Sequence, residues 1–397
     1  MPDSPPDSWT IPSVPIEAVL GREDVRVFDL RSPSEFGLDH LPGARNLHLF
    51  DDVERALIGT IYAKQSPDEA FETGRDRVLQ RISPLVSELA EHLGRSMPAA
   101  NLEEWVTRLT SEGMAGVRRE MTVERQRDVP AGSTILHCWR GGLRSSSLVV
   151  LLRAIGWPNV FVLDGGYKSY RRQVLKDLGA WVSPPSFVLR GPTGVGKTLV
   201  LREIERLRCG WTLDLEGHAG HRSSILGMVG LQPCNQKTFD SRLATRMREG
   251  FPGPVVIEGE SRKVGDSIVP DSIWDSMCGA VQLRLDAPMD YRVDVLIADY
   301  LATEENREPL RAQLPFIETR LGPKKWHGVL VELFDSGQER ELVKVLLDLY
   351  YDPLYQHSEK GREHSQHFDA SDVSRVALEI VAWIEKHLSN ELQNSLL

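Results

Sequence analysis

Residues 186–198, Ser-Phe-Val-Leu-Arg-Gly-Pro-Thr-Gly-Val-Gly-Lys-Thr, constrain the fold of this chain more than any other stretch. They predict a short apolar strand, a glycine-rich turn and the start of a helix, and the turn matches G-x-x-x-x-G-K-[ST] in full. In such a turn the backbone N–H groups point inward, and the helix N-terminus adds partial positive charge. We therefore predict a phosphate-binding site in which Lys197 reaches the terminal phosphates and Thr198 can offer a hydroxyl to Mg²⁺.

The chain has 397 residues, enough for two or three domains. No apolar run approaches the ~20 residues of a membrane span, and the acidic, proline-rich N-terminus is unlike a signal peptide. The four cysteines lie far apart, without a CxxC pair. These features predict a cytoplasmic protein with no membrane partner. The net charge of −10 argues against non-specific coating of nucleic acid, although a local basic face could still bind RNA.

The first half of the chain alternates strands and helices. We predict strands at 25–30, 44–48, 134–136 and 160–163, and a helical pattern from about 51 to 125. Such alternation makes a parallel sheet whose ligands bind at the C-terminal ends of the strands. We assign residues 1–13 to a loose leader and 14–180 to the first domain, with a helical insertion at about 51–128.

The second domain, 184–397, begins after Pro184-Pro185. The predicted elements after the phosphate loop are strands at 211–215, 254–260, 280–285 and 366–369, a polar glycine loop at 216–224, and helices at 235–249, from 288, and at 373–387. The apolar strand at 254–260 ends in carboxylates, and Glu258 lies where such folds place an acid that assists Mg²⁺. The residues assigned to the phosphate site are Gly191, Gly194, Gly196, Lys197, Thr198 and Glu258. The sequence thus predicts an α/β chain, with a parallel-sheet domain followed by a P-loop NTPase-like α/β domain and a helical C-terminal part.

Cys138 follows a predicted strand and precedes a turn with two glycines and two arginines, Arg140 and Arg144. The turn's backbone N–H groups, a helix N-terminus near Ser145 and both arginines would stabilise a thiolate or bind an anion beside the sulfur. Residues 137–173 carry six Lys or Arg and one acid, in contrast to the acidic whole. We therefore predict that Cys138, Arg140 and Arg144 are catalytic, and that the other three cysteines are structural.

The spacing of Cys138 and Arg144, C-x5-R, is shared by persulfide-forming transferases and by phosphatases that use a phosphocysteine. A phosphatase also needs a positioned general acid, and the sequence offers no clear candidate. The segments Asp29-Leu30-Arg31, His40-Leu41-Pro42-Gly43-Ala44 and Leu163-Asp164-Gly165-Gly166-Tyr167 accompany the cysteine loop. Together they resemble a rhodanese domain, which favours transfer of sulfur or selenium.

A rhodanese-like domain followed by a P-loop domain is an uncommon pairing, and this chain resembles the bacterial tRNA 2-selenouridine synthases over roughly residues 15–358. The segments that carry the resemblance are 29–36, 59–62, 138–145, 163–168, 191–198, His221-Arg222, Glu258 with Glu260-Ser261-Arg262, and 350–355. The Cys-Trp-Arg-Gly-Gly loop is the most specific of these. The resemblance implies a transferase that replaces sulfur by selenium at C2 of wobble 2-thiouridine in tRNA, with selenophosphate as the donor.

The resemblance also implies transfer of a geranyl group from geranyl diphosphate to that sulfur, which gives an S-geranylated intermediate. Cys138 would then carry selenium or meet the donor, Arg140 and Arg144 would bind the donor's phosphate, and the loop at 191–198 would hold the diphosphate with Mg²⁺ near Thr198. Selenophosphate synthetase is an expected source of the donor. Whether ATP is bound stays open. The residues singled out as candidate RNA contacts are Lys168, Arg171, Arg172, Arg222, Arg262, Lys263, Lys324 and Lys325.

Two other interpretations stay open at the level of sequence. One is a rhodanese-type sulfurtransferase coupled to an ATP-dependent kinase-like domain, acting on a small molecule; the other is a non-catalytic, phosphate-binding RNA module. Two histidine-containing sets, Glu216 with His218 and His221, and His357 with His364 and His367, lack a recognised metal-binding spacing. We therefore predict no metal site built from protein ligands alone.

Overall fold

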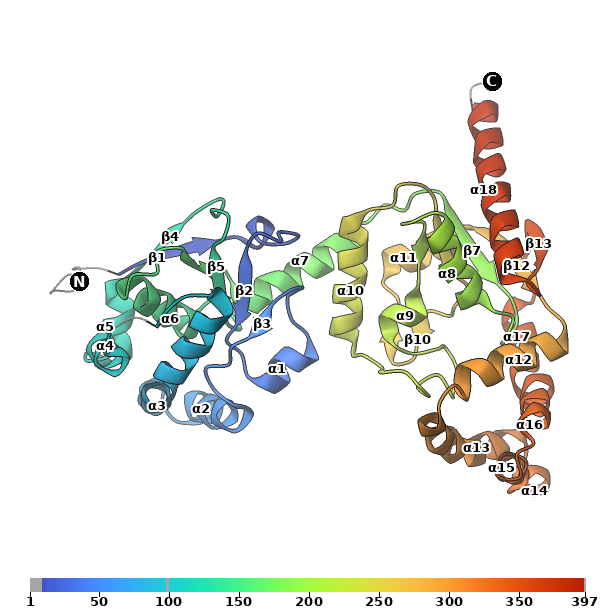
Figure 1. Ribbon diagram of the computed structural model, residues 1–397, viewed down its shortest axis with the longest axis horizontal. Coiled ribbons are helices and arrows are strands. Elements are labelled where there is room, and N and C mark those ends of the chain that lie inside the picture. The colour runs from blue at the N-terminus through green and yellow to red at the C-terminus, as the bar shows by residue number, and fades with distance from the viewer. Residues whose placement is uncertain (1–8, 98–99, 396–397) are drawn as a thin grey trace. The chain divides into compact units, whose positions relative to one another are not determined.

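The computed structural model describes residues 9–97 and 100–395. The chain divides into two compact units, Met1–Lys176 and Asp177–Leu397, and each is described by itself. Figure 1 shows the elements of both units. The division falls a few residues before the boundary predicted at 180–184.

The first unit contains a six-stranded parallel sheet with the order β3-β2-β5-β6-β1-β4. Its strands are β1 (Trp9–Val14), β2 (Arg26–Asp29), β3 (Arg45–Asn46), β4 (Met121–Arg125), β5 (Thr134–His137) and β6 (Val160–Leu163). The apolar runs predicted at 25–30, 134–136 and 160–163 are thus confirmed as strands.

Two strands of this sheet depart from the sequence prediction. Residues 9–13, assigned to a loose leader, belong to β1, which pairs with both β4 and β6. Prolines at positions 12 and 15 hide this strand in the sequence, whereas in the fold Trp9, Ile11 and Val14 are buried. Residues 121–125, assigned to the helical pattern, form β4 instead. The insertion is therefore helical only as far as Glu120.

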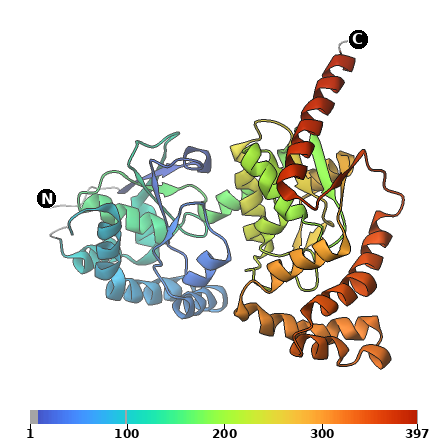
Figure 2. The same ribbon diagram turned by 45° about the vertical axis from the view of Figure 1, so that its right-hand side comes forward.

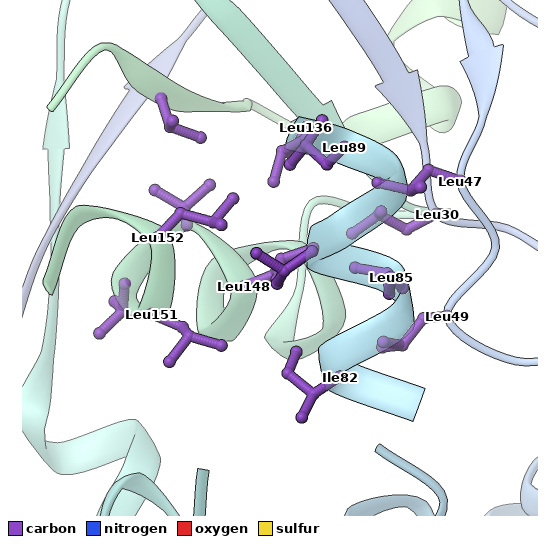
Figure 3. Close-up of a cluster of buried hydrophobic side chains, with 14 of the residues drawn as sticks. Leu30, Leu47, Leu49, Ile82, Leu85, Leu89, Leu136, Leu148, Leu151 and Leu152 are labelled. Atoms are coloured by element: carbon purple, nitrogen blue, oxygen red, sulfur yellow. The ribbon is translucent and has the colours of Figure 1, made fainter. Parts of the chain in front are cut away.

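The helices of the first unit are α1 (Pro33–Leu38), α2 (Asp52–Lys64), α3 (Pro67–Leu93), α4 (Leu102–Leu109), α5 (Gly113–Glu120) and α6 (Leu143–Ala154), with a 3₁₀ turn at Ile16–Ala18. Helix α7 (Gly166–Ala180) begins in this unit and its last four residues belong to the second. Ser66 caps α3 by accepting hydrogen bonds from its first turn, and Gly94 ends it in a left-handed conformation. The buried face of α3 packs on α6 and the sheet, and Figure 3 shows Leu85 and Leu89 facing Leu148, Leu30 and Leu47. The long insertion helix is therefore part of the core that supports β5.

The second unit contains a five-stranded parallel sheet with the order β13-β12-β7-β9-β8. Its strands are β7 (Ser186–Arg190), β8 (Thr212–Leu213), β9 (Val255–Glu258), β12 (Val281–Asp286) and β13 (Gln366–Asp369). A short antiparallel pair, β10 (Lys263–Val264) and β11 (Ser267–Ile268), was not predicted. The first helix after the phosphate loop, α8, packs beside the last helix, α18, and Figures 1 and 2 show α18 extending beyond the sheet.

The helices of this unit are α8 (Lys197–Leu207), α9 (Leu215–Ala219), α10 (Gln236–Glu249), α11 (Asp271–Gly279), α12 (Met289–Tyr300), α13 (Arg307–Leu321), α14 (Pro323–Trp326), α15 (Val329–Asp335), α16 (Glu339–Leu346), α17 (Asp352–Glu359) and α18 (Val373–Ser395). A 3₁₀ turn at Glu304–Asn306 precedes α13, and a π-helical turn at Leu347–Tyr351 joins α16 to α17. The prediction of a P-loop-type α/β fold with a helical C-terminal part is confirmed.

The segment after β8 corrects the predicted polar loop at 216–224. Asp214 accepts a hydrogen bond from the backbone N–H of Gly217 at 2.6 Å, and this cap starts the short helix α9 at Leu215. The predicted strand at 211–215 is correspondingly reduced to two residues. Within residues 9–97 and 100–395, no helix combines the length and the apolar character that a membrane crossing requires.

Candidate active sites

The phosphate loop of the second unit has the predicted strand–turn–helix form. It follows β7 and ends where α8 begins at Lys197, with Gly194 and Gly196 at φ angles of 79° and 91°. A Cβ at Gly191 would lie 2.6 Å from the carbonyl oxygen of Leu285, and one at Gly194 would lie 2.9 Å from that of Arg292. A residue with a side chain is therefore excluded at Gly191 and Gly194, because the φ angles favour glycine and backbone oxygens of other segments approach closely.

Lys197 and Thr198 lie between the loop and a group of acids. The Nζ of Lys197 donates a hydrogen bond to the carbonyl oxygen of Gly191 at 3.1 Å and lies 3.9 Å from Oε1 of Glu260. The hydroxyl of Thr198 donates to Oε2 of Glu258 at 3.4 Å. The sequence-predicted residues Lys197, Thr198 and Glu258 are thus brought together in one site.

Three carboxylates, from Glu216, Glu258 and Glu260, lie with one oxygen of each within 4.8 Å of the others. Glu258 is fully buried and accepts a hydrogen bond from the backbone N–H of Glu216 at 2.6 Å. Burial, helped by the Glu216 carboxylate, raises the pKa of Glu258 well above its usual value. Burial and the Glu260 carboxylate raise the pKa of Glu216 to about 7. Oxygen ligands of this kind, with the Thr198 hydroxyl beside them, suit Mg²⁺.

In the sequence, Glu216 lies near His218 and His221, a set without a recognised metal-binding spacing. The structure instead joins Glu216 to the carboxylates that follow β9, and among the described residues neither histidine set forms a three-residue cluster. The signal was present in the topology: β8 and β9 are adjacent parallel strands, and Glu216 and Glu258 both lie at their carboxyl ends. Sequence alone does not reveal which strands are neighbours.

The segment at 350–355 contacts the phosphate loop through Arg292. Asp352 pairs with Arg292, whose Nη1 lies 3.0 Å from Oδ2, and the Nε of Arg292 donates to the carbonyl oxygen of Thr193 at 2.9 Å. Both partners are largely withdrawn from solvent. This arginine therefore positions the loop, a role that the sequence analysis did not predict.

In the first unit, Cys138 follows β5 directly and is 3% exposed. Its Sγ lies 3.4 Å from the Oγ of Ser145, which in turn donates to the carbonyl oxygen of Gly142. Helix α6 begins at the next residue, Leu143. The cysteine therefore lies at a strand end and against a helix N-terminus, as predicted.

The cysteine loop is held by the segment at 163–168. The backbone N–H groups of Tyr167 and Lys168 donate to the carbonyl oxygens of Cys138 at 2.9 Å and Trp139 at 3.0 Å. Gly166 has a φ of 57°, and a Cβ there would collide with the carbonyl oxygen of Cys138. The two motifs that the sequence analysis treated separately thus form one structural unit.

Asp29 and Arg31 form a buried ion pair near this loop, with Nη2 and Oδ2 2.5 Å apart. The Arg31 guanidinium also donates to the carbonyl oxygen of Asp39 and lies 3.7 Å from the centre of the Tyr167 ring. The Tyr167 hydroxyl donates to Asp39 at 2.7 Å. Since these groups are satisfied by one another, the Asp-Leu-Arg segment acts as a support for the Cys138 loop.

Cys138, Arg140 and Arg144 all line one cavity of about 810 Å³. Its other walls come from the insertion helices, which were predicted only as a helical pattern, and from α6. The structure therefore brings the three predicted catalytic residues together, and it adds a cavity that no sequence motif indicated.

The candidate RNA contacts differ in their availability. Lys168 and Arg172 are exposed on α7, whereas Arg171 lies 3.7 Å from the Asp39 carboxylate. Arg222 is engaged by Asp299 at 2.7 Å and stacks on Tyr300, and Arg262 pairs with Asp271. Lys168 and Arg172 are accordingly the better placed of these five to reach a polyanion.

A family model and several known proteins are similar to this chain. Residues 184–390 match the model of the tRNA 2-selenouridine synthase AAA domain. Proteins named tRNA 2-selenouridine synthase are similar over most of both chains: 31% identical in Cupriavidus necator (85% of this chain, 89% of the relative), 30% in Aeromonas salmonicida (86% and 90%) and 28% in Nitrosomonas europaea (88% and 92%). A solved domain of a putative ATP/GTP binding protein from Clostridium difficile is 29% identical over 41% of this chain and 97% of its own, but its TM-score of 0.28 is too low to establish a common fold.

Proposed function

The chain belongs to the tRNA 2-selenouridine synthase family, and from this premise we propose that it replaces the sulfur at C2 of a wobble 2-thiouridine in tRNA by selenium. The observation that carries the proposal is the loop at 138–145, where a buried thiol lies with two arginines on one cavity. The presence of a phosphate loop with a carboxylate cluster in the same chain gives the second site that the proposed chemistry needs.

In the first site, Cys138 contacts selenophosphate, whose selenium bonds to C2. Water then cleaves the selenium–phosphorus bond and phosphate leaves. Arg140 and Arg144 supply positive charge for the phosphate of the donor, since guanidinium groups bind phosphate with paired hydrogen bonds. The N-terminus of α6 adds to this charge. Selenophosphate synthetase is the proposed source of the donor.

In the second site, the loop at 191–198 binds the diphosphate of geranyl diphosphate. The 2-thiouridine sulfur forms a bond to the allylic carbon while the carbon–oxygen bond breaks and diphosphate leaves. The S-geranyl group is a better leaving group than the thiocarbonyl sulfur, so that selenium can then attack C2 and geranyl thiol departs. A Mg²⁺ held by Thr198, Glu216, Glu258 and Glu260 would neutralise phosphate charge.

The phosphate loop and its carboxylates also fit ATP, which keeps the kinase-coupled sulfurtransferase as a second candidate. Geranyl diphosphate and ATP can be compared directly as ligands of the full chain, with and without Mg²⁺, by isothermal titration calorimetry. Binding of geranyl diphosphate that Lys197→Ala weakens by about tenfold or more supports the synthase, since the lysine contributes a charge-assisted contact. Tight binding of ATP with none of geranyl diphosphate would favour the alternative.

The activity itself is tested on tRNA that carries 2-thiouridine at the wobble position. Wild-type protein with selenophosphate and geranyl diphosphate is expected to convert it to 2-selenouridine, detected by mass spectrometry of the nucleosides. A non-catalytic RNA module would bind the tRNA and leave the nucleoside unchanged.

A further inference from the structure

The cavity beside Cys138 is larger than the cysteine chemistry requires. Selenophosphate is a compact anion, whereas a volume of about 810 Å³ lies within the range of ~300–1,000 Å³ that is usual for sites of organic ligands. Most of its wall is apolar, with side chains such as Phe50, Phe71, Val78, Leu109 and Leu148. The cavity is therefore suited to an apolar group and not only to the donor.

The insertion leaves this space open because of the residues on one face of α2. Ala56, Gly59 and Ala63 follow each other at three- and four-residue spacing, share one helix face, and all line the cavity. None of the residues of α2 is buried, although the helix is held in place by its Asp51 cap. Helix α6 contributes Ser147 to the same cavity, between larger residues. Small side chains from two helices thus line a space that a packed core would have filled.

The charged residues of the cavity wall are all basic. They are Arg55, Lys64, Arg75, Arg118, Arg140 and Arg144, in a chain whose net charge is −10. Arg55 and Arg75 pair with acids outside the cavity. In the described part of the chain, the other four make no ion pair with an acid. An apolar interior with a basic lining matches a ligand that joins an apolar chain to phosphates.

We propose that this cavity holds the geranyl chain of the S-geranylated wobble nucleotide while the selenium of selenophosphate, bound beside Cys138, attacks C2 and geranyl thiol leaves. This proposal rests on the proposed function, and it adds where the geranyl group lies while selenium replaces sulfur at C2. Because the geranyl group is attached to the sulfur that leaves C2, it must lie close to the group that brings selenium to the same carbon. Cys138 is itself part of the wall, and the basic residues face the nucleotide's phosphates.

The apolar cavity next to the phosphate loop is a poor alternative for the chain. It is lined mainly by apolar residues such as Leu226 and Tyr300, together with Thr193 and Glu339, and its volume of about 30 Å³ has room for only a few water molecules. The diphosphate of a free donor can bind at the loop, but this cavity does not accommodate ten carbon atoms. The geranyl chain of free geranyl diphosphate could also enter the Cys138 cavity. The experiment below distinguishes the free donor from the geranylated nucleotide.

The test uses the full-length protein and anticodon stem–loop RNAs whose 2-thiouridine carries either an S-geranyl or an S-methyl group. Dissociation constants are measured for wild type, for Ala63→Trp and Ser147→Phe, which fill the cavity from α2 and α6, and for Val53→Trp. Val53 lies on α2, is 77% exposed and does not line the cavity, so it is the matched control. Affinity for the S-methyl RNA reports whether each variant is folded and still binds RNA.

Wild type and Val53→Trp are expected to bind the geranylated RNA about tenfold or more tightly than the methylated one, because nine additional carbons leave water. The two filling variants should lose this preference and keep their affinity for methylated RNA. If they keep the preference, or lose both RNAs equally, the inference is wrong. Production of 2-selenouridine by wild type is measured in parallel, so that a failure of the inference is distinguished from a failure of the proposed function.

A second arm titrates geranyl diphosphate. Loss of its binding in the filling variants assigns the cavity to the chain of the free donor as well. Loss only in Lys197→Ala assigns the donor to the phosphate loop and leaves the cavity to the nucleotide-bound chain. Equal binding by all variants together with an unchanged preference for geranylated RNA overturns the proposal.

Discussion

Glu216 carries a pKa of about 7 because it is buried beside the carboxylates of Glu258 and Glu260. Its folded-state pKa is above the unfolded value, so the stability it contributes is present below about pH 4.5 and is lost as the pH rises through about 7. In Mg²⁺-free buffer, the melting temperature of wild type should therefore fall between pH 5 and pH 8. Glu216→Gln should flatten this profile, while Glu249→Gln, at an exposed position, should leave it unchanged.

Glu258 tests the carboxylate cluster as a cation site. Glu258→Gln keeps the size of the side chain and replaces a buried carboxyl, whose pKa burial raises well above its usual value, by a neutral amide. The ligand-free protein should therefore unfold at the same or a higher temperature. The increase in melting temperature that Mg²⁺ with geranyl diphosphate produces should be largely lost, because a ligand stabilises only in proportion to its affinity. An undiminished increase would show that the cluster does not hold the cation.

We propose that the selenium step depends on Cys138. Cys138→Ser is expected to abolish formation of 2-selenouridine while S-geranylation of the tRNA continues, since the second site is intact. Cys278→Ser, which changes an exposed cysteine of the second unit, is the control and should be fully active. Mass spectrometry of wobble nucleosides measures both products, and selenation by the Cys138 variant would remove the thiol from the mechanism.

At the scale of elements, the start of α7 fixes the carbonyl groups of the cysteine loop. Gly166→Ala places a Cβ against the carbonyl oxygen of Cys138 and at a φ of 57°, so we expect a loss of selenation of tenfold or more and a lower melting temperature. Gly179 lies in the same helix with open space around it, and Gly179→Ala should be neutral or slightly stabilising. Equal effects of the two substitutions would contradict the proposed positioning.

The elements that were predicted correctly are those whose signal is local. The strand at 160–163 is a continuous apolar run between turn residues, and the helix predicted at 235–249 is present at 236–249. The strand at 9–14 was missed because its place is set by pairing with β4 and β6, which are distant in sequence. Helix α9 was missed for a different reason: its cap from Asp214 is local, but the helix has only five residues and contains Gly217.

The same distinction applies to the sites. Motif residues such as Lys197, Thr198 and Cys138 could be assigned from sequence because contiguous residues build each loop. That Glu216 lies close to Glu258 could not be predicted, because it depends on β8 and β9 being neighbouring strands. The cavity beside Cys138 is enclosed by residues of α2, α3 and α6. Its size depends on how these helices pack, which no local sequence pattern indicates.

For the whole molecule, an acidic chain that acts on tRNA must bind it through a local basic region. Residues 137–173 hold six Lys or Arg and one acid, and they include the exposed Lys168 and Arg172. With roughly four phosphate contacts, tRNA affinity should fall about 100-fold between 50 and 200 mM salt, because each contact releases counterions. Filter binding over a salt series measures this, and a flat response would contradict the tRNA assignment.

The central claim, that this chain replaces sulfur by selenium in the wobble nucleoside through an alkylated intermediate, is tested most directly by one measurement. Purified protein is incubated with tRNA containing wobble 2-thiouridine, with selenophosphate and geranyl diphosphate added separately and together, and the nucleosides are analysed by mass spectrometry. We predict S-geranyl-2-thiouridine with geranyl diphosphate alone and 2-selenouridine when both are present. Unmodified 2-thiouridine under all of these conditions would contradict the claim.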